Sequence, residues 1–253
     1  MPYLDREGVR IYYEEHGDGP TLLLSHGYTS TGRMWNCQVS ALSKDFRILV
    51  WDMRGHGRSD SPEDPTLYSE ELTVGDMAGI LDICGASAAF IGGLSLGGYM
   101  SLAFYRRYPE RSQALLLFDT GPGYKSDTAR AAWNERAEAR ARDLEDRGLE
   151  ALNQSPEVAA SRHRGAQGLA LAARGMLAQR DSTIMELLPE IAVPTLVVVG
   201  AEDTPFLAAT DYMTAKIPQA RKVVIPDAGH ASNIDQPQLF NQALRSFLES
   251  LPA

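Results

Sequence analysis

A serine framed by glycines stands between an apolar run and a helical pattern in this chain. Gly93 and Gly97 flank Ser95 in the pentapeptide Gly-Leu-Ser-Leu-Gly, directly after the apolar residues 88–91. A serine on a sharp strand-to-helix turn needs small neighbours, because the turn is strained and crowded. Its hydroxyl then projects from the sheet, toward helix amides that can stabilise negative charge on a substrate oxygen. Ser95 is therefore the predicted nucleophile.

A serine hydroxyl is a poor nucleophile near neutral pH, so Ser95 requires a base. His230 is the predicted base because it follows the last predicted strand, where its ring can reach the carboxyl edge of a parallel sheet. The histidine in turn needs a carboxylate that orients its ring and stabilises the imidazolium. Asp203 follows another predicted strand and is the preferred candidate, with Asp119 at the end of an earlier strand and the adjacent Glu202 as alternatives. Serine, aspartate and histidine thus follow three different strands, in that order.

The other four histidines are assigned to supporting or exposed positions. His26 and His56 follow predicted strands and are expected to brace their loops, because metal-ligating partners at a suitable spacing are missing. His16 lies in a polar turn and His163 in a charged segment, so both are expected to face solvent. The sequence therefore predicts no metal site.

Two backbone amides are the predicted oxyanion donors. One is the N–H of Leu96, the residue after the nucleophile. The other belongs to the loop after an earlier strand, where Tyr28 is the preferred position. Both are backbone roles, so replacing either side chain tests them poorly.

Short runs of branched and aliphatic residues alternate with longer amphipathic stretches in the first 120 residues and again from residue 194. This alternation predicts a mostly parallel sheet with helices on both faces. The candidate strands are residues 9–15, 21–25, 47–52, 88–93, 113–119, 195–200 and 222–226. The candidate helices are residues 33–42, 70–84, 96–108, 207–216 and 237–251.

Strand character is lost between residues 121 and 190, which are rich in Ala, Arg and Glu. A helical lid is predicted there, inserted into a core formed by residues 1–120 and 191–253. Trp133, with Ala137, Ala141 and Leu144, falls on one face of the first predicted lid helix. Packing is the preferred role of Trp133, and lining of the substrate pocket is the alternative.

Composition narrows the possible partners of the chain. Its 253 residues carry 24 Lys and Arg against 33 Asp and Glu, a net charge of -9 that disfavours nucleic acid and anionic membranes. Cys37 and Cys84 form no metal or disulfide motif. A small molecule is the expected partner.

Charges near the N-terminus and the lack of a long apolar run predict a cytoplasmic protein without a membrane span. The sequence leaves the oligomeric state open, with a homodimer as one option.

Five motifs carry a resemblance to a known family. They are Ser25-His26-Gly27-Tyr28, Arg54-Gly55-His56-Gly57, Gly93-Leu94-Ser95-Leu96-Gly97-Gly98, Gly200-Ala201-Glu202-Asp203 and Gly229-His230. With them the chain resembles the α/β-hydrolase superfamily over essentially its whole length. The resemblance implies an α/β fold with a mostly parallel eight-stranded sheet flanked by helices, and a helical lid after the sixth strand. It also implies nucleophile, acid and base roles for Ser95, Asp203 and His230, with Leu96 and Tyr28 as oxyanion donors.

Within that superfamily, Met34-Trp35, the loop at residues 54–57 and the Gly-Leu-Ser-Leu-Gly-Gly turn resemble 3-oxoadipate enol-lactonases and related carboxylesterases. The expected activity is hydrolysis of small carboxylic esters through an acyl-enzyme on Ser95, with no cofactor. Opening of an enol-lactone or cleavage of a carbon-carbon bond in a diketone is the alternative on the same three residues. A ligand-binding or signalling protein on a hydrolase scaffold is the alternative from another class. Relatives that open epoxides or remove halide use an aspartate nucleophile, and Ser95 argues against both.

Overall fold

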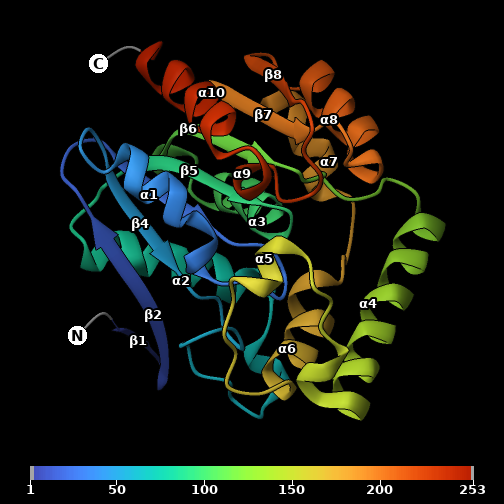
Figure 1. Cartoon of the computed structure of the whole chain (residues 1–253). Coiled ribbons are helices and arrows are strands. Elements are labelled where there is room, and N and C mark those ends of the chain that lie inside the picture. The colour runs from blue at the N-terminus through green and yellow to red at the C-terminus, as the bar shows by residue number, and fades with distance from the viewer. Residues whose placement is uncertain (1–2, 252–253) are drawn as a thin grey trace.

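Eight strands form a single twisted sheet in the computed structural model, which describes residues 3–251 (Figure 1). The spatial order is β1-β2-β4-β3-β5-β6-β7-β8. The first two strands run antiparallel to their neighbours, and all later pairs are parallel. The strands are β1 Tyr3–Arg6, β2 Val9–His16, β3 Thr21–Ser25, β4 Arg47–Trp51, β5 Ala89–Leu94, β6 Ser112–Phe118, β7 Thr195–Gly200 and β8 Ala220–Ile225. The ends of the predicted core, residues 1–2 and 252–253, lie outside the described residues.

Helices cover both faces of the sheet because its central strands are apolar on both sides. Leu22 and Leu24 of β3 pack with α1 and α10 on one face, while Leu23 packs with α2 and α3 on the other. The core helices are α1 Asn36–Leu42, α2 Glu70–Ile83, α3 Leu96–Arg107, α8 Thr204–Lys216, α9 Ser232–Asp235 and α10 Pro237–Glu249. One 3-10 turn, η1 Gly32–Trp35, leads into α1. The expected α/β architecture is therefore confirmed.

Two elements differ from those expected from the sequence. The edge strand β1 is absent from the seven candidate strands, since its four residues include Asp5 and Arg6 and show no clear alternation. It is defined by its pairing with β2, which the sequence pattern does not encode. Helix α8 begins at Thr204 rather than at residue 207, because Pro205 stands in the first turn, where a missing N–H costs nothing.

Residues 121–190, here called the inserted segment, connect β6 to β7 and contain helices but no strand. The helices are α4 Asp127–Arg147, α5 Pro156–Ala159, α6 Gln167–Ala172 and α7 Thr183–Leu187, with short turns η4 Gly148–Ala151, η5 Ala173–Leu177 and η6 Leu188–Glu190. Helix α4 buries Ala141 and Leu144 against Leu169 of α6. Arg174 ties η5 to α4 by a 2.8 Å ion pair with Glu138. The segment thus has a small apolar core of its own.

None of the helices within residues 3–251 is both long enough and apolar enough to cross a membrane.

Candidate active site

Ser95 occupies a strained turn between β5 and α3. Its backbone has φ 55° and ψ −115°, a combination that L-residues rarely adopt. A Cβ at Gly97 would overlap the Ser25 carbonyl oxygen, and one at Gly93 would overlap the Gly97 backbone. The Ser95 N–H donates to the Phe118 carbonyl oxygen at 2.9 Å, which ties the turn to β6. The glycines on both sides of Ser95 are therefore required by the close approach of β3 to the turn between β5 and α3.

Asp203 and His230 meet at the same edge of the sheet. Asp203 follows β7 and is almost fully buried, while His230 follows β8 and keeps about a third of its side chain exposed. The His230 Nδ1–H donates to the Asp203 carboxylate at 2.9 Å, and the Phe206 ring stacks on the His230 ring with their centroids 5.0 Å apart. Burial lowers the pKa of His230, but the hydrogen bond and charge of Asp203 outweigh it and leave the pKa above its ordinary value. The pair is thus arranged to hold a proton on His230.

The other two carboxylates considered from the sequence have different partners. Asp119 is fully buried and accepts hydrogen bonds from the Gly200 N–H at 2.8 Å and from the Ser232 hydroxyl. Burial raises the pKa of Asp119 to about 7. Glu202 is exposed at the surface. Within residues 3–251 neither group hydrogen-bonds to His230, whereas Asp203 does.

The loop after β3 lies directly beside Ser95. A Cβ placed on Gly27 would be 3.5 Å from the Ser95 Cβ, so the loop in which Tyr28 follows Gly27 borders the serine turn. Leu96 is the first residue of α3, and the first-turn amides of a helix have no carbonyl partner within it. Among the described residues, no hydrogen bond joins Ser95 Oγ to the His230 ring. Contacts of this kind are often long in unliganded enzymes and tighten when substrate binds.

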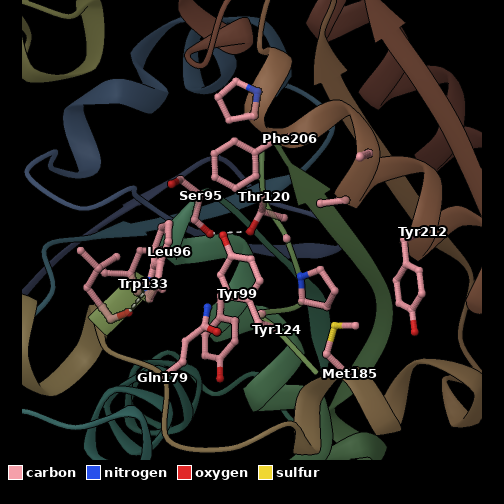
Figure 2. A pocket seen from close by; sticks show the side chains of 17 residues that line it. Ser95, Leu96, Tyr99, Thr120, Tyr124, Trp133, Gln179, Met185, Phe206 and Tyr212 are labelled. Atoms are coloured by element: carbon pink, nitrogen blue, oxygen red, sulfur yellow. Dashed lines mark hydrogen bonds between the residues drawn. The ribbon is translucent and has the colours of Figure 1, made fainter. Parts of the chain in front are cut away.

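A cavity of about 310 Å³ opens next to Ser95, between the sheet edge and the inserted segment (Figure 2). Ser95, Leu96 and Trp133 line it, while Tyr28, Asp203 and His230 do not. The Trp133 indole N–H donates to the Leu177 carbonyl oxygen at 2.8 Å, which fixes the ring at the cavity wall. The remaining lining residues are Tyr99, Thr120, Gly121, Pro122, Gly123, Tyr124, Leu177, Gln179, Met185, Pro205, Phe206, Ala208, Ala209 and Tyr212. None of the lining residues carries a formal charge.

Three histidines cluster beside the loop that carries Tyr28, with His26 and His56 buried and His163 half-buried. The His26 ring lies 5.0 Å from that of His56, which lies 5.9 Å from that of His163. His163 was expected to face solvent, and that prediction is wrong. Its Nδ1 accepts from the Gly57 N–H at 3.1 Å and its Nε2–H donates to the Thr29 carbonyl oxygen at 2.9 Å. The physical reason is that the inserted segment folds back onto the loops after β3 and β4.

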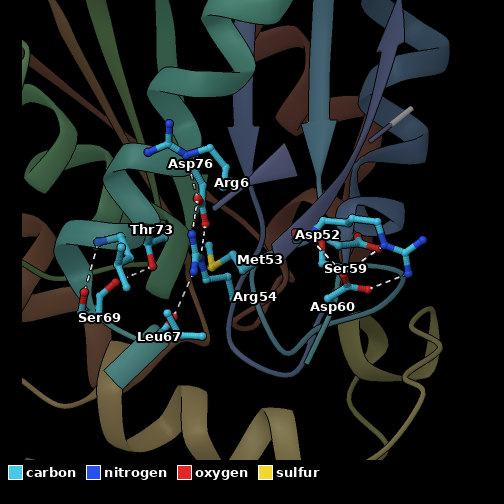
Figure 3. Close-up of polar contacts among 12 residues, drawn as sticks. Arg6, Asp52, Met53, Arg54, Ser59, Asp60, Leu67, Ser69, Thr73 and Asp76 are labelled. Carbon is cyan, nitrogen blue, oxygen red and sulfur yellow. Dashed lines mark hydrogen bonds and ion pairs between the residues drawn. The ribbon is translucent and has the colours of Figure 1, made fainter. Parts of the chain in front are cut away.

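A buried ion pair holds the loop after β4 in place (Figure 3). The Arg54 guanidinium donates to both oxygens of Asp76 in α2, at 2.7 and 2.9 Å, and both side chains are almost completely buried. At the start of the loop, Asp52 accepts from the Gly32 N–H and, across the loop, from the Arg58 N–H, each at 2.8 Å. These contacts fix the loop that carries His56, and with it the histidine cluster.

The part of the chain that the structure describes contains no group of three or more His, Cys, Asp or Glu side chains arranged to hold a metal ion.

The family model described as "Alpha/beta hydrolase family" matches residues 22–243, which include the serine turn and both partners of the Asp203–His230 pair. The chain belongs to the alpha/beta hydrolase family. Its sheet order and its helices on both faces agree with that membership, and general hydrolase activity is supported by its relatives.

Three relatives illustrate the range of chemistry within the family. The chain is 29% identical to 3-oxoadipate enol-lactonase 1 from Acinetobacter baylyi, over 98% of this chain and 96% of that protein. A thermophilic esterase from Thermogutta terrifontis, solved with malate bound, is 31% identical with a TM-score of 0.83, over 100% of this chain and 98% of the other. The enol-lactonase from Burkholderia xenovorans LB400 is 29% identical with a TM-score of 0.80, over 98% of this chain and 100% of the other.

Proposed function

We propose that the chain hydrolyses small, uncharged carboxylic esters through an acyl-enzyme formed on Ser95. The observation that carries the proposal is the position of Ser95, on a strained turn at the wall of a cavity without charged residues. The Asp203–His230 pair lies at the same sheet edge and can supply the base. Likeness to an esterase and to enol-lactonases supports acyl transfer to water as the reaction class.

The proposed reaction has two stages. His230 takes the Ser95 proton as Oγ attacks the ester carbonyl carbon, and Asp203 stabilises the imidazolium that results. The oxyanion then accepts hydrogen bonds from the Leu96 and Tyr28 amides, and the alcohol departs with the proton from His230. In the second stage a water molecule, deprotonated by His230, attacks the acyl-enzyme and releases the carboxylic acid. The helices of the inserted segment serve as a lid that limits the access of bulk water.

The neutral lining of the cavity favours an uncharged ester over the lactone substrates that the resemblance suggests. An oxoadipate enol-lactone carries a free carboxylate, and burial of that charge requires a cationic partner. No Lys, Arg or His side chain lines the cavity beside Ser95. The net charge of -9 also opposes the approach of an anion. Enol-lactone opening and diketone cleavage remain the alternatives on the same three residues, and parallel assays with neutral esters, anionic lactones and diketones separate them.

The decisive test replaces the nucleophile. Ser95→Ala is expected to abolish turnover of a short nitrophenyl ester and labelling by a fluorophosphonate probe, while circular dichroism shows an unchanged fold. Ser87→Ala, at an exposed serine before β5, is the matched control and should keep both properties. Retained turnover in Ser95→Ala would overturn the proposal. A folded wild-type protein that ignores both ester and probe would instead favour the ligand-binding alternative.

A further inference from the structure

The inserted segment directs one amide side chain into the cavity. Gln179 lies between η5 and α7, and its backbone is clamped by Asn134 of α4. The Gln179 N–H donates to Asn134 Oδ1, and Asn134 Nδ2 donates to the Gln179 carbonyl oxygen, both at 2.8 Å. With its main chain held in this way, Gln179 lines the same cavity as Ser95 (Figure 2).

The amide of Gln179 has no partner for its oxygen. Only 9% of the residue is exposed, and within residues 3–251 no hydrogen bond reaches Oε1. Gly123 lies against the amide in a conformation with φ +89°, and a Cβ there would be 2.8 Å from Oε1. A side chain at position 123 would therefore overlap the amide, and among the described residues no donor pairs with its oxygen. Buried polar groups are almost always paired, so such an orphan at a cavity wall points to a ligand group as the missing partner.

The character of that ligand group follows from the surrounding wall. The cavity has no charged lining residue and is mostly aromatic and aliphatic, so polar recognition falls to a few neutral groups. The unpaired atom is an acceptor, so its partner must donate an O–H or N–H, which a hydroxyl or an amide supplies without a full charge.

We propose that Gln179 is a specificity-determining residue, whose side-chain amide hydrogen-bonds to a second, uncharged polar group on the ester that Ser95 attacks. The inference rests on the proposed esterase function and names its substrate class. The preferred substrates are small esters with a hydroxyl or amide N–H group in the part that fills the cavity. Esters with purely alkyl groups bind with the amide still unpaired and are hydrolysed less efficiently.

Matched ester pairs test this assignment. In the first pair, nitrophenyl pentanoate is compared with its β-hydroxy analogue. In the second pair, butyl butanoate is compared with its analogue that carries a hydroxyl in the alcohol part. For wild type, kcat/KM should favour the hydroxyl ester in at least one pair. Gln179→Leu should lower kcat/KM for that hydroxyl ester by about tenfold and leave the alkyl ester unchanged or faster.

Two further variants keep the test decisive. Gln179→Met retains an unbranched side chain without the amide and should give the same loss if the leucine variant fails to fold. Met185→Leu, at another lining position, is the control and should change both members of a pair by the same factor. Equal changes for both members in the Gln179 variants would assign Gln179 to packing and overturn the inference.

The outcome also separates this inference from the proposed function. If hydrolysis depends on Ser95 but the Gln179 variants still distinguish the two esters of each pair as wild type does, the inference is overturned and the proposed function stands. A wild-type protein that hydrolyses no ester and resists the fluorophosphonate probe overturns the proposed function, and the inference with it.

Discussion

The buried ring of His26 is expected to lower the stability of the folded protein in mild acid. The His26 ring is fully buried, with Nε2 accepting from the Met53 N–H at 2.9 Å and Nδ1–H donating to the Gly27 carbonyl oxygen at 2.7 Å. Burial lowers the pKa of His26 to about 3, against 6.5 for an ordinary histidine. The ring therefore stays neutral in the folded protein at pH values where the unfolded chain binds a proton.

Because the folded-state pKa is the lower one, His26 contributes stability above pH 6.5 that is lost as the pH falls toward 3. Within this window each unit by which the pH falls lowers the free energy of unfolding by about 1.4 kcal/mol. The loss between pH 6.5 and about pH 5 therefore adds up to about 2 kcal/mol. Burial lowers the pKa of His56 and of His163, so both act in the same direction. The raised pKa values of His230 and Asp119 act in the opposite direction, so the wild-type slope alone does not isolate His26.

The difference between wild type and His26→Gln isolates the effect. A glutamine amide offers an acceptor and a donor but does not titrate in this range. Urea unfolding gives the free energy of unfolding of both proteins at about pH 7.5 and about pH 5. Wild type should lose about 2 kcal/mol more than the variant between the two conditions. Losses that agree within about 0.5 kcal/mol would refute the description of His26 as a buried neutral ring.

Two further predictions concern buried carboxylates. Asp76→Ala leaves the buried Arg54 guanidinium without its partner and should cost about 3–5 kcal/mol in urea unfolding, while Arg54→Met combined with Asp76→Leu recovers most of it. A loss below about 1 kcal/mol for the single variant would contradict this. Asp119→Asn removes the negative charge that Asp119 carries above its own pKa of about 7 and that raises the pKa of His230, so the upper part of the acidic limb of the kcat/KM profile should move to lower pH. An unmoved limb would show that Asp119 does not act on the ring.

The serine turn is the part of the site most completely encoded by local sequence. Positions 93 and 97 must be glycine because a Cβ at either one would overlap backbone atoms of the turn or of the adjoining strand. This requirement appears in the sequence as a short motif. The alternation of apolar and amphipathic runs likewise predicted the α/β fold, because burial on both faces requires it. The edge strand β1 carries no such pattern and is visible only through its pairing.

The hydrogen-bond partners of the candidate carboxylates and of His230, in contrast, depend on segments far apart in the chain. Asp119, Glu202 and Asp203 were all candidates from the sequence, since all three stand beyond the end of a strand. Their neighbours differ because the loops after β7 and β8 bring only Asp203 within hydrogen-bonding distance of His230.

The sequence by itself determined the fold class, the turn that bears the serine and the chain order of the polar residues, because these follow from local sterics and periodic burial. Tertiary structure alone decided which carboxylate meets His230, that His163 is half-buried with both ring nitrogens hydrogen-bonded, and that the cavity wall is uncharged with Gln179 in it. The physical reason is that hydrogen bonds and cavities arise between elements whose relative placement is set by the packing of the whole core, which no short stretch of sequence records.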